Sequence, residues 1–302
     1  MAIGIVSESH QHYYFYNMNT EFQKYLSNLL NENIIEIHSV SGGDISEAFK
    51  IITPKNTYFL KTNWASSLNM FQTEASALKH ISNTNTIKTP KIIAVDTFEN
   101  HAFLLMEFIE SKSPTSNDFK TLGLQLADMH NCSADGFGLE QDNFIGTLPQ
   151  SNTKHKSWCD FYINERLLPQ LKIAKQKQLL SDNECPTKGL LLEKLQPLFQ
   201  NIKPSLLHGD LWGGNFLISS QGEPYLIDPA LYYGHGEVDI AMTKLFGGFG
   251  EDFYKSYHNI LPKDLHTVQR IDIYQLYYLL VHLNLFGRTY YGSVSRILRK
   301  YF

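Results

Sequence analysis

The feature that most constrains the fold of this chain is the segment "LHGDLWGGNFLI" at residues 207–218, which places Asp210 and Asn215 in a glycine-containing stretch. The segment "PYLIDPA" follows at residues 224–230. Together they predict a loop, a strand, a turn at "SSQGE" and a second strand that ends at Asp228. Because such a hairpin brings its two open ends together, the three polar side chains are expected to share one site.

The residue types and their spacing match the needs of phosphoryl transfer. Carboxylate and amide oxygens suit Mg²⁺, and H-x-D-x-x-x-x-N from His208 to Asn215 is the catalytic-loop spacing of protein-kinase-like phosphotransferases. These enzymes need a carboxylate that accepts or orients the acceptor's hydroxyl proton, and two oxygen groups that hold magnesium. The pattern predicts Asp210 as the base, and Asn215 and Asp228 as metal ligands. The simpler alternative is an Asp–Asn turn with an unrelated Asp.

A kinase of this class must also carry a glycine-rich loop, a strand lysine and a helix glutamate, in that order, before the catalytic loop. Three short strand patterns come first, at residues 34–40, 47–53 and 58–63. Gly42 and Gly43 lie between the first two, Lys61 lies on the third, and Glu74 lies in a helical pattern at residues 70–81. Lys61 would hold the α- and β-phosphates, with Glu74 orienting it. Each feature alone is commonplace, since paired glycines often mark only a hairpin and a single Lys or Glu is usually solvated.

Hydrophobic patterns divide the chain into a strand-rich part and a helix-rich part. The strand pattern that ends near Ile109 is followed by the polar stretch "ESKSPTSND", and the later patterns are mainly helical. We therefore predict an α+β, bilobal protein-kinase-like fold with a small antiparallel-sheet lobe and a larger, mainly helical lobe. The predicted boundaries are a loosely ordered extension at 1–17, an N-terminal nucleotide-binding lobe at 18–109 and a C-terminal catalytic lobe at 110–302.

Composition narrows the classes of partner and compartment. Lys and Arg number 26 against 30 Asp and Glu, so the formal charge of −4 gives no sign of a nucleic-acid surface. The three cysteines form no CxxC pair, which argues against a disulfide framework or a zinc site and favours a reducing cytoplasm. No apolar run approaches the length of about 18 residues that a membrane span needs, and no signal-peptide pattern is present. These features predict a cytoplasmic protein without membrane or nucleic-acid partners.

Taken together, the motifs resemble the fructosamine-3-kinase (ketosamine kinase) family over about residues 20–302. The resemblance is carried by "GGDISEAFKI", "YFLKTN", "FQTEASAL", "LLMEFIE", "DNFIGTLPQ", "LLHGDLWGGN", "IDPALYYGHGEVDIAMTKLFGGF" and "YQLYYLLVHLNLFG". Related aminoglycoside and choline kinases share the catalytic Asp and Asn but lack the Trp after "HGDL" and the long run after "IDPA". The family implies a two-lobed fold that transfers the γ-phosphate of ATP to the 3-hydroxyl of ketosamines. Its products break down spontaneously, so the family is regarded as performing deglycation.

The resemblance also implies how ATP and Mg²⁺ would bind. It repeats the base, the two metal ligands and the Lys–Glu ion pair named above. It adds a nucleotide hinge at Glu107, Phe108 and Ile109, whose backbone groups would pair with adenine, although a plain buried strand would look the same. Several relatives carry a Cys in the glycine loop where this chain has Asp44, so redox control through that position is not expected.

On the acceptor side, Trp212 is the main candidate because it lies two residues beyond the proposed base. An indole face suits the apolar side of a sugar or an amine cation, although simple packing of the loop is the alternative. Asn143 and His282 are further candidates for acceptor contacts. The resemblance to kinase-like folds places His208 and Asp239 in structural support of the catalytic loop.

Two polar clusters allow other interpretations. His235, Glu237 and Asp239 alternate in "HGEVD", which resembles a metal site, but Asp239 is also well placed as the N-cap of the following helix. Asp128 and His130 in "LADMH" lie near a helix end, where structural contacts are expected rather than catalysis.

Three functions remain open from the sequence. The favoured one is an ATP-dependent ketosamine kinase that acts on a small molecule or a glycated protein. The second is an aminoglycoside- or choline-type kinase of the same fold. The third is a nucleotide-binding protein without catalysis, which has no chemical need for Lys61, Asp210, Asn215 and Asp228 together.

Overall fold

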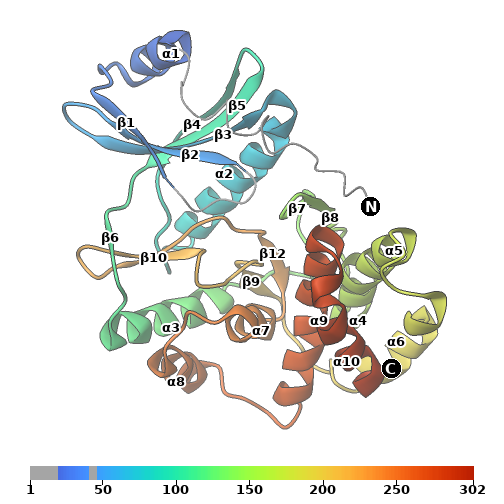
Figure 1. The fold of residues 1–302 in the computed structure, drawn as a ribbon. Coiled ribbons are helices and arrows are strands. Elements are labelled where there is room, and N and C mark those ends of the chain that lie inside the picture. The colour runs from blue at the N-terminus through green and yellow to red at the C-terminus, as the bar shows by residue number, and fades with distance from the viewer. Residues whose placement is uncertain (1–19, 41–45) are drawn as a thin grey trace, which may run out of the picture.

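A five-stranded antiparallel sheet forms the N-terminal part of the molecule, in the order β1-β2-β3-β5-β4 (Figure 1). Its strands are β1 (Glu36–Ser39), β2 (Glu47–Ile52), β3 (Thr57–Trp64), β4 (Ile92–Phe98) and β5 (His101–Glu107). The structure, a computed structural model, describes residues 20–40 and 46–302. The predicted extension at 1–17 and the predicted phosphate loop at Gly42, Gly43 and Asp44 lie outside the described residues.

Two helices cover opposite faces of this sheet. Successive side chains of a strand point to opposite faces, so Phe103 and Leu105 of β5 pack with α1 (Thr20–Leu30), whereas Leu104 packs with α2 (Leu68–Asn83). Leu29 of α1 is 43% exposed and does not share this contact. The contact stripe instead follows the row of every fourth residue, which is Phe22, Leu26 and Leu30.

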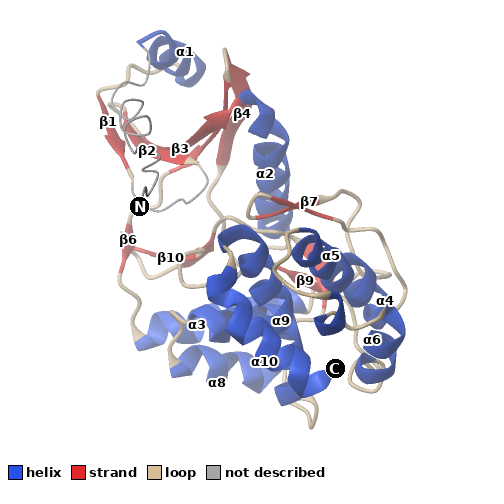
Figure 2. Ribbon diagram, turned by 45° about the vertical axis from the view of Figure 1, so that its right-hand side comes forward, coloured by secondary structure: helices blue, strands red, loops and turns tan. Residues whose placement is uncertain are grey.

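The C-terminal part is mainly helical, and α9 (Thr267–Phe286) lies at its centre (Figure 2). The helices around it are α3 (Ser116–His130), α4 (Trp158–Phe161), α5 (Leu168–Gln176), α6 (Lys188–Leu195), α7 (Glu237–Phe246), α8 (Glu251–Ile260) and α10 (Tyr291–Tyr301). Short 3₁₀ segments cover Ala65–Ser67, Asp182–Glu184 and Arg288–Tyr290. A π-helix at Tyr162–Leu167 lies between α4 and α5, and α5 ends at Gln176.

Short strands line the boundary between the two parts. They are β6 (Ser111–Lys112), β7 (Asn143–Ile145), β8 (Leu148–Gln150), β9 (Ser205–Leu207), β10 (Phe216–Ser219), β11 (Pro224–Leu226) and β12 (Tyr232–Gly234). The predicted hairpin is present, since β10 pairs antiparallel with β11, and β12 pairs with β9. Strand β6 pairs with β10, so the polar stretch at 110–118 is attached to the C-terminal sheet. The residue boundaries of the lobes remain a prediction.

Across residues 20–40 and 46–302, no helix has both the length and the apolar character needed to cross a membrane.

Candidate active site

The hairpin β10–β11 brings the two predicted metal ligands to one place. Phe216 lies opposite Leu226, and the Ile227 amide donates to the Asn215 carbonyl at 3.1 Å. Asn215 and Asp228 therefore lie at the open end of the hairpin. Asp228 has a φ of 54°, in the left-handed region that residues other than glycine rarely adopt. Strained backbone of this kind is common at functional sites.

Asp210 lies directly against this open end. The Asn215 side-chain amide donates to the Asp210 carbonyl at 2.8 Å and to its carboxylate Oδ2 at 3.2 Å. Loss of hydration raises the pKa of Asp210 to about 7; the bond from Asn215 opposes this rise, and the nearby Asp239 carboxylate adds to it. Within the described chain, Asn215 Oδ1 has no hydrogen-bond partner, which leaves this oxygen available as a ligand.

A fully buried carboxylate lies beneath the loop that carries Asp210. Asp239 accepts from the backbone amides of His208 at 2.7 Å and Gly209 at 2.9 Å. The alternative reading of Asp239 as an N-cap is wrong, because α7 begins at Glu237 with Gly236 as its N-cap. For Asp239 to be the N-cap, the helix would have to start three residues later, at Ile240.

Two further side chains hold Asp239 in place. His130 Nε2 lies 3.1 Å from Asp239 Oδ2, and His130 Nδ1 lies 2.8 Å from the Tyr257 hydroxyl. Because an ionised carboxylate only accepts, His130 donates through Nε2 and its Nδ1 accepts from Tyr257. The structural contact expected for His130 is thus present, and it connects α8 to the catalytic loop.

His208 connects the catalytic loop to the end of the hairpin. Its Nε2 donates to the Ile227 carbonyl at 2.8 Å, and its Nδ1 accepts from the Asp210 amide at 3.2 Å. Burial lowers the pKa of His208, which keeps the ring neutral as this pattern requires. Next to it, Gly209 has a φ of 85°, and a Cβ there would lie 2.1 Å from the Ala230 carbonyl oxygen, so only glycine fits.

The predicted ion pair of the N-terminal part is formed. Lys61 on β3 donates from Nζ to Glu74 Oε1 on α2 at 2.8 Å, and its Nζ also pairs with Asp228 Oδ1. Both members of the Lys–Glu pair are largely buried. Lys61 therefore connects β3, α2 and the end of the β10–β11 hairpin, and it contacts both Glu74 and Asp228, which were predicted to lie in the same site.

The predicted hinge lies where β5 ends. The Glu107 amide donates to the Lys91 carbonyl at 2.9 Å, and the Phe108 amide donates to the Thr57 carbonyl at 3.3 Å. The Ile109 amide has no partner among residues 20–40 and 46–302. A free backbone donor at this point is what pairing with an adenine base requires.

The predicted acceptor residues differ in how they are used. Trp212 is 42% exposed, and its ring lies over Gly214, where a Cβ would be 2.3 Å from the indole. Asn143 is buried and donates to the Leu231 carbonyl at 2.8 Å, while its Oδ1 accepts from Gln150 and Asn152. Asn143 thus attaches the β7–β8 hairpin to the segment that follows Asp228.

The side chains of His235 and Glu237 in "HGEVD" make hydrogen bonds with residues of α9. His235 Nδ1 lies 2.9 Å from the Tyr274 hydroxyl, and Glu237 accepts from Arg270 Nε at 2.7 Å. The part of the chain that the structure describes contains no group of three or more His, Cys, Asp or Glu side chains arranged to hold a metal.

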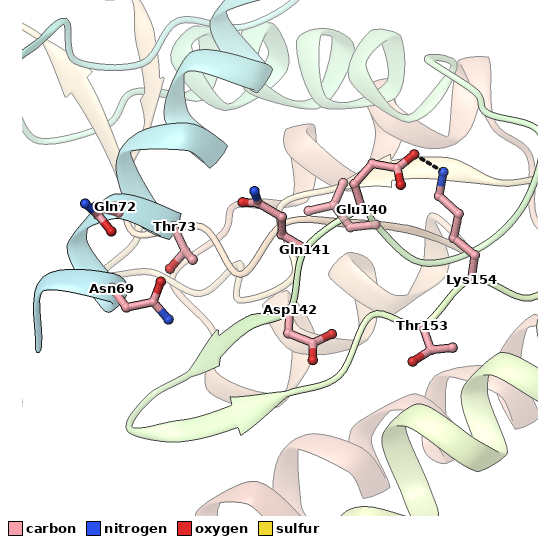
Figure 3. A pocket seen from close by; sticks show the side chains of 9 residues that line it. Asn69, Gln72, Thr73, Glu140, Gln141, Asp142, Thr153 and Lys154 are labelled. Carbon is pink, nitrogen blue, oxygen red and sulfur yellow. Dashed lines mark hydrogen bonds and ion pairs between the residues drawn. The ribbon is translucent and has the colours of Figure 1, made fainter.

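A hollow of about 790 Å³ lies between the first half of α2 and the segments at 139–142 and 153–154 (Figure 3). Leu139 is the one apolar residue of its lining, and an ion pair between Lys154 and Glu140 lies at its edge. Thr73 of this lining adjoins Glu74 in sequence, but none of the predicted site residues lines the hollow.

Sequence reasoning missed two tyrosines that support the loop. The Tyr278 hydroxyl donates to the Gly209 carbonyl at 2.8 Å, and Tyr257 orients His130 as described. Both are buried and lie far from the loop in sequence. With 17 tyrosines in the chain, no sequence signal separates these two from the others.

Comparison with known proteins adds an independent finding. A family model described as fructosamine kinase matches residues 18–302. A protein-ribulosamine 3-kinase of Arabidopsis thaliana is 40% identical over 274 residues, covering 89% of this chain and 83% of the relative. A crystal structure of a candidate fructosamine-3-kinase from Haemophilus somnus 129PT superposes with a TM-score of 0.83 at 28% identity, covering 92% of this chain and 95% of the other.

A more distant solved structure bears on the fold alone. An aminoglycoside phosphotransferase in complex with AMP-PNP and hygromycin B has a TM-score of 0.64 at 16% identity, covering 93% of this chain and 98% of the other. The arrangement of sheet and helices is therefore that of the protein-kinase-like phosphotransferases, as predicted.

Proposed function

Because the chain belongs to the fructosamine kinase family, we propose that it transfers the γ-phosphate of ATP to the 3-hydroxyl group of a ketosamine. The acceptor oxygen forms a bond to the γ-phosphorus, the bond from that phosphorus to the ADP oxygen breaks, and the hydroxyl proton leaves. The products are ADP and a 3-phosphorylated ketosamine, from a free or a protein-bound amine.

Asp210 is the proposed proton acceptor. The bond from the Asn215 amide to Oδ2 fixes the orientation of its carboxylate, and the buried Asp239 fixes the backbone on which it stands. With the loop held at both points, the remaining carboxylate oxygen is free to receive the acceptor hydroxyl.

The residues present fit a magnesium ion. Asn215 Oδ1 has no partner within the described ranges, and the Asp228 carboxylate lies at the same end of the hairpin, so two hard oxygen donors are available. A bound Mg²⁺ would neutralise charge on the phosphates. Lys61, oriented by Glu74, would bind the α- and β-phosphates, and the Ile109 amide would pair with adenine.

For the acceptor, we propose that Trp212 lines the sugar side, since its indole is exposed beside the base. Asn143 has a positioning role in this proposal, because most of its side-chain amide is used to attach the β7–β8 hairpin.

The observation that carries this proposal is the connected set Lys61–Asp228–Asn215–Asp210, supported by buried groups from four helices, α3, α7, α8 and α9. The test is ATP consumption with purified protein against fructosamines, ribulosamines, choline and aminoglycosides, with Asp210→Asn as the inactive control. We expect turnover with ketosamines. Turnover confined to choline or aminoglycosides would reject the ketosamine assignment, and turnover with none of them would reject catalysis on these alcohols.

A further inference from the structure

Four aromatic side chains gather where α7 and α9 end, and we call them the aromatic cluster: Phe246, His282, Phe286 and Tyr290. The His282 ring is in the middle, with centroid distances of 4.5 Å to Phe246, 5.5 Å to Phe286 and 5.1 Å to Tyr290. Phe286 is 54% exposed, whereas Phe246 and Tyr290 are partly buried and pack against the main core, so the cluster opens to solvent at Phe286.

The cluster adjoins the catalytic loop at two points. The Tyr278 hydroxyl reaches the Gly209 carbonyl, and His282 follows Tyr278 by one helical turn of α9. On the other side, a Cβ at Gly213 would lie 3.2 Å from the Gly248 Cα, so the loop packs directly on the chain that leaves Phe246. Tyr277 of the same helix donates to Gln150 of β8 at 2.5 Å, and Figure 1 shows this end of α9 next to β8.

The imidazole ring of His282 has one nitrogen that can accept a hydrogen bond from a ligand. His282 Nδ1 lies 2.8 Å from the Tyr278 carbonyl, and a carbonyl can only accept, so Nδ1 carries the hydrogen. Burial lowers the pKa of His282, so the ring is neutral and its Nε2 is a hydrogen-bond acceptor. No partner for Nε2 exists in the described part of the chain.

We propose that the aromatic cluster binds the protonated amine of the acceptor, with its N–H donating to His282 Nε2 and its charge lying against the rings of Phe246 and Phe286. This inference rests on the proposed function and names the part of the acceptor that this surface recognises. Aromatic faces attract ammonium ions, and a neutral imidazole accepts from them without repulsion. The sugar hydroxyls would then face Asp210 and Trp212, and the amine substituent would point toward solvent past Phe286.

The test compares two acceptors of similar size: a fructosamine with a dialkylamine, whose nitrogen is protonated, and the derivative in which an acyl group replaces one alkyl group, whose nitrogen is a neutral amide. Phe286→Ala should raise KM for the amine roughly 3- to 30-fold. KM for ATP and for the N-acyl compound should stay within twofold of the native protein. Val268→Ala, at the exposed start of the same helix, is the matched control and should change none of these values.

A second variant removes the acceptor nitrogen. His282→Phe keeps an aromatic ring and should lower kcat/KM for the amine but not for the N-acyl compound, with melting temperature checked in parallel. Equal effects of either variant on both compounds, or no effect on either, would overturn the amine site while leaving ketosamine turnover intact. Absence of turnover by the native protein with every ketosamine would instead reject the proposed function, and this inference with it.

Discussion

Asp239 accepts three hydrogen bonds in a fully buried position, and Asp239→Asn should therefore be costly to both stability and turnover. Oδ2 accepts from the His208 amide and His130 Nε2, and Oδ1 accepts from the Gly209 amide. Asparagine keeps the shape but has one oxygen, so its NH₂ must replace one of the two acceptors. The least harmful orientation keeps the oxygen at the Oδ2 position and leaves the Gly209 amide facing another donor.

The magnitude follows from this loss. A buried donor left without a partner costs about 1–3 kcal/mol, and bonds to a charged acceptor are worth about 1.5–3 kcal/mol each. Since two bonds survive in weakened form, we expect the free energy of unfolding to fall by about 2–4 kcal/mol in urea titrations. The displaced loop should also lower kcat by about tenfold or more, because Asp210 stands on it. Nucleotide affinity should stay within about twofold, since the Lys61–Glu74 pair is untouched.

The matched control is Asp272→Asn on α9. Asp272 pairs with Lys300 at 2.7 Å near the surface, and such pairs contribute at most about 1 kcal/mol. If Asp239→Asn and Asp272→Asn give the same unfolding free energy and the same kcat, the buried carboxylate does not support the loop and the reasoning fails.

Four further outcomes are expected. Asp210→Asn should lower kcat by roughly 10²-fold or more with nucleotide binding retained, and near-normal turnover in this variant would refute the base. Asp228→Ala should weaken magnesium-dependent ATP binding and activity together, which a magnesium titration measures; an unchanged magnesium dependence counts against it. Trp212→Ala should raise KM for the ketosamine about ten- to a hundredfold with KM for ATP nearly unchanged, whereas parallel losses with a lower melting temperature would indicate mere packing. Burial, opposed by Glu237, lowers the pKa of His235 to about 4, below its ordinary value near 6.5. Because the unfolded chain therefore takes up this proton first, about 2 kcal/mol of the free energy of unfolding should be lost as pH falls from 7 to 5. His235→Gln should lose less over the same range, and an equal pH dependence of unfolding in both proteins would contradict this.

The sequence predicts the residues whose roles depend on local order. Lys61, Glu74, Asp210, Asn215 and Asp228 follow one another in a fixed pattern of strand, helix, loop and hairpin, and the structure brings them into contact. This succeeds because a hairpin's pairing is set by its own turn and by the alternation of its side chains.

The contacts beneath the loop do not follow from local rules. Aspartate is a residue type that often caps helices, yet the Asp239 side chain binds the backbone of a loop that lies 30 residues earlier in the sequence. His130 meets Tyr257 across 127 residues, and such a partnership depends on how α3 and α8 pack rather than on either segment. The polar stretch at 110–118 is predicted only as the boundary between the lobes, whereas in the structure it pairs with β10 and contains the start of α3 at Ser116. Tertiary packing decides these cases, and a single sequence does not record it.

Three nearby residues of α9 reach three different places: Tyr277 binds β8, Tyr278 binds the loop that carries Asp210, and His282 lies at the centre of the aromatic cluster. In protein engineering, these three residues of α9 therefore cannot be changed in position independently of one another. An insertion of one residue before Tyr277 would rotate all three side chains by about 100°. With the amine site proposed above, acceptor preference would then depend on this helix as well as on the loops. A chimera must transfer the whole helix together with the loop and hairpin that it touches.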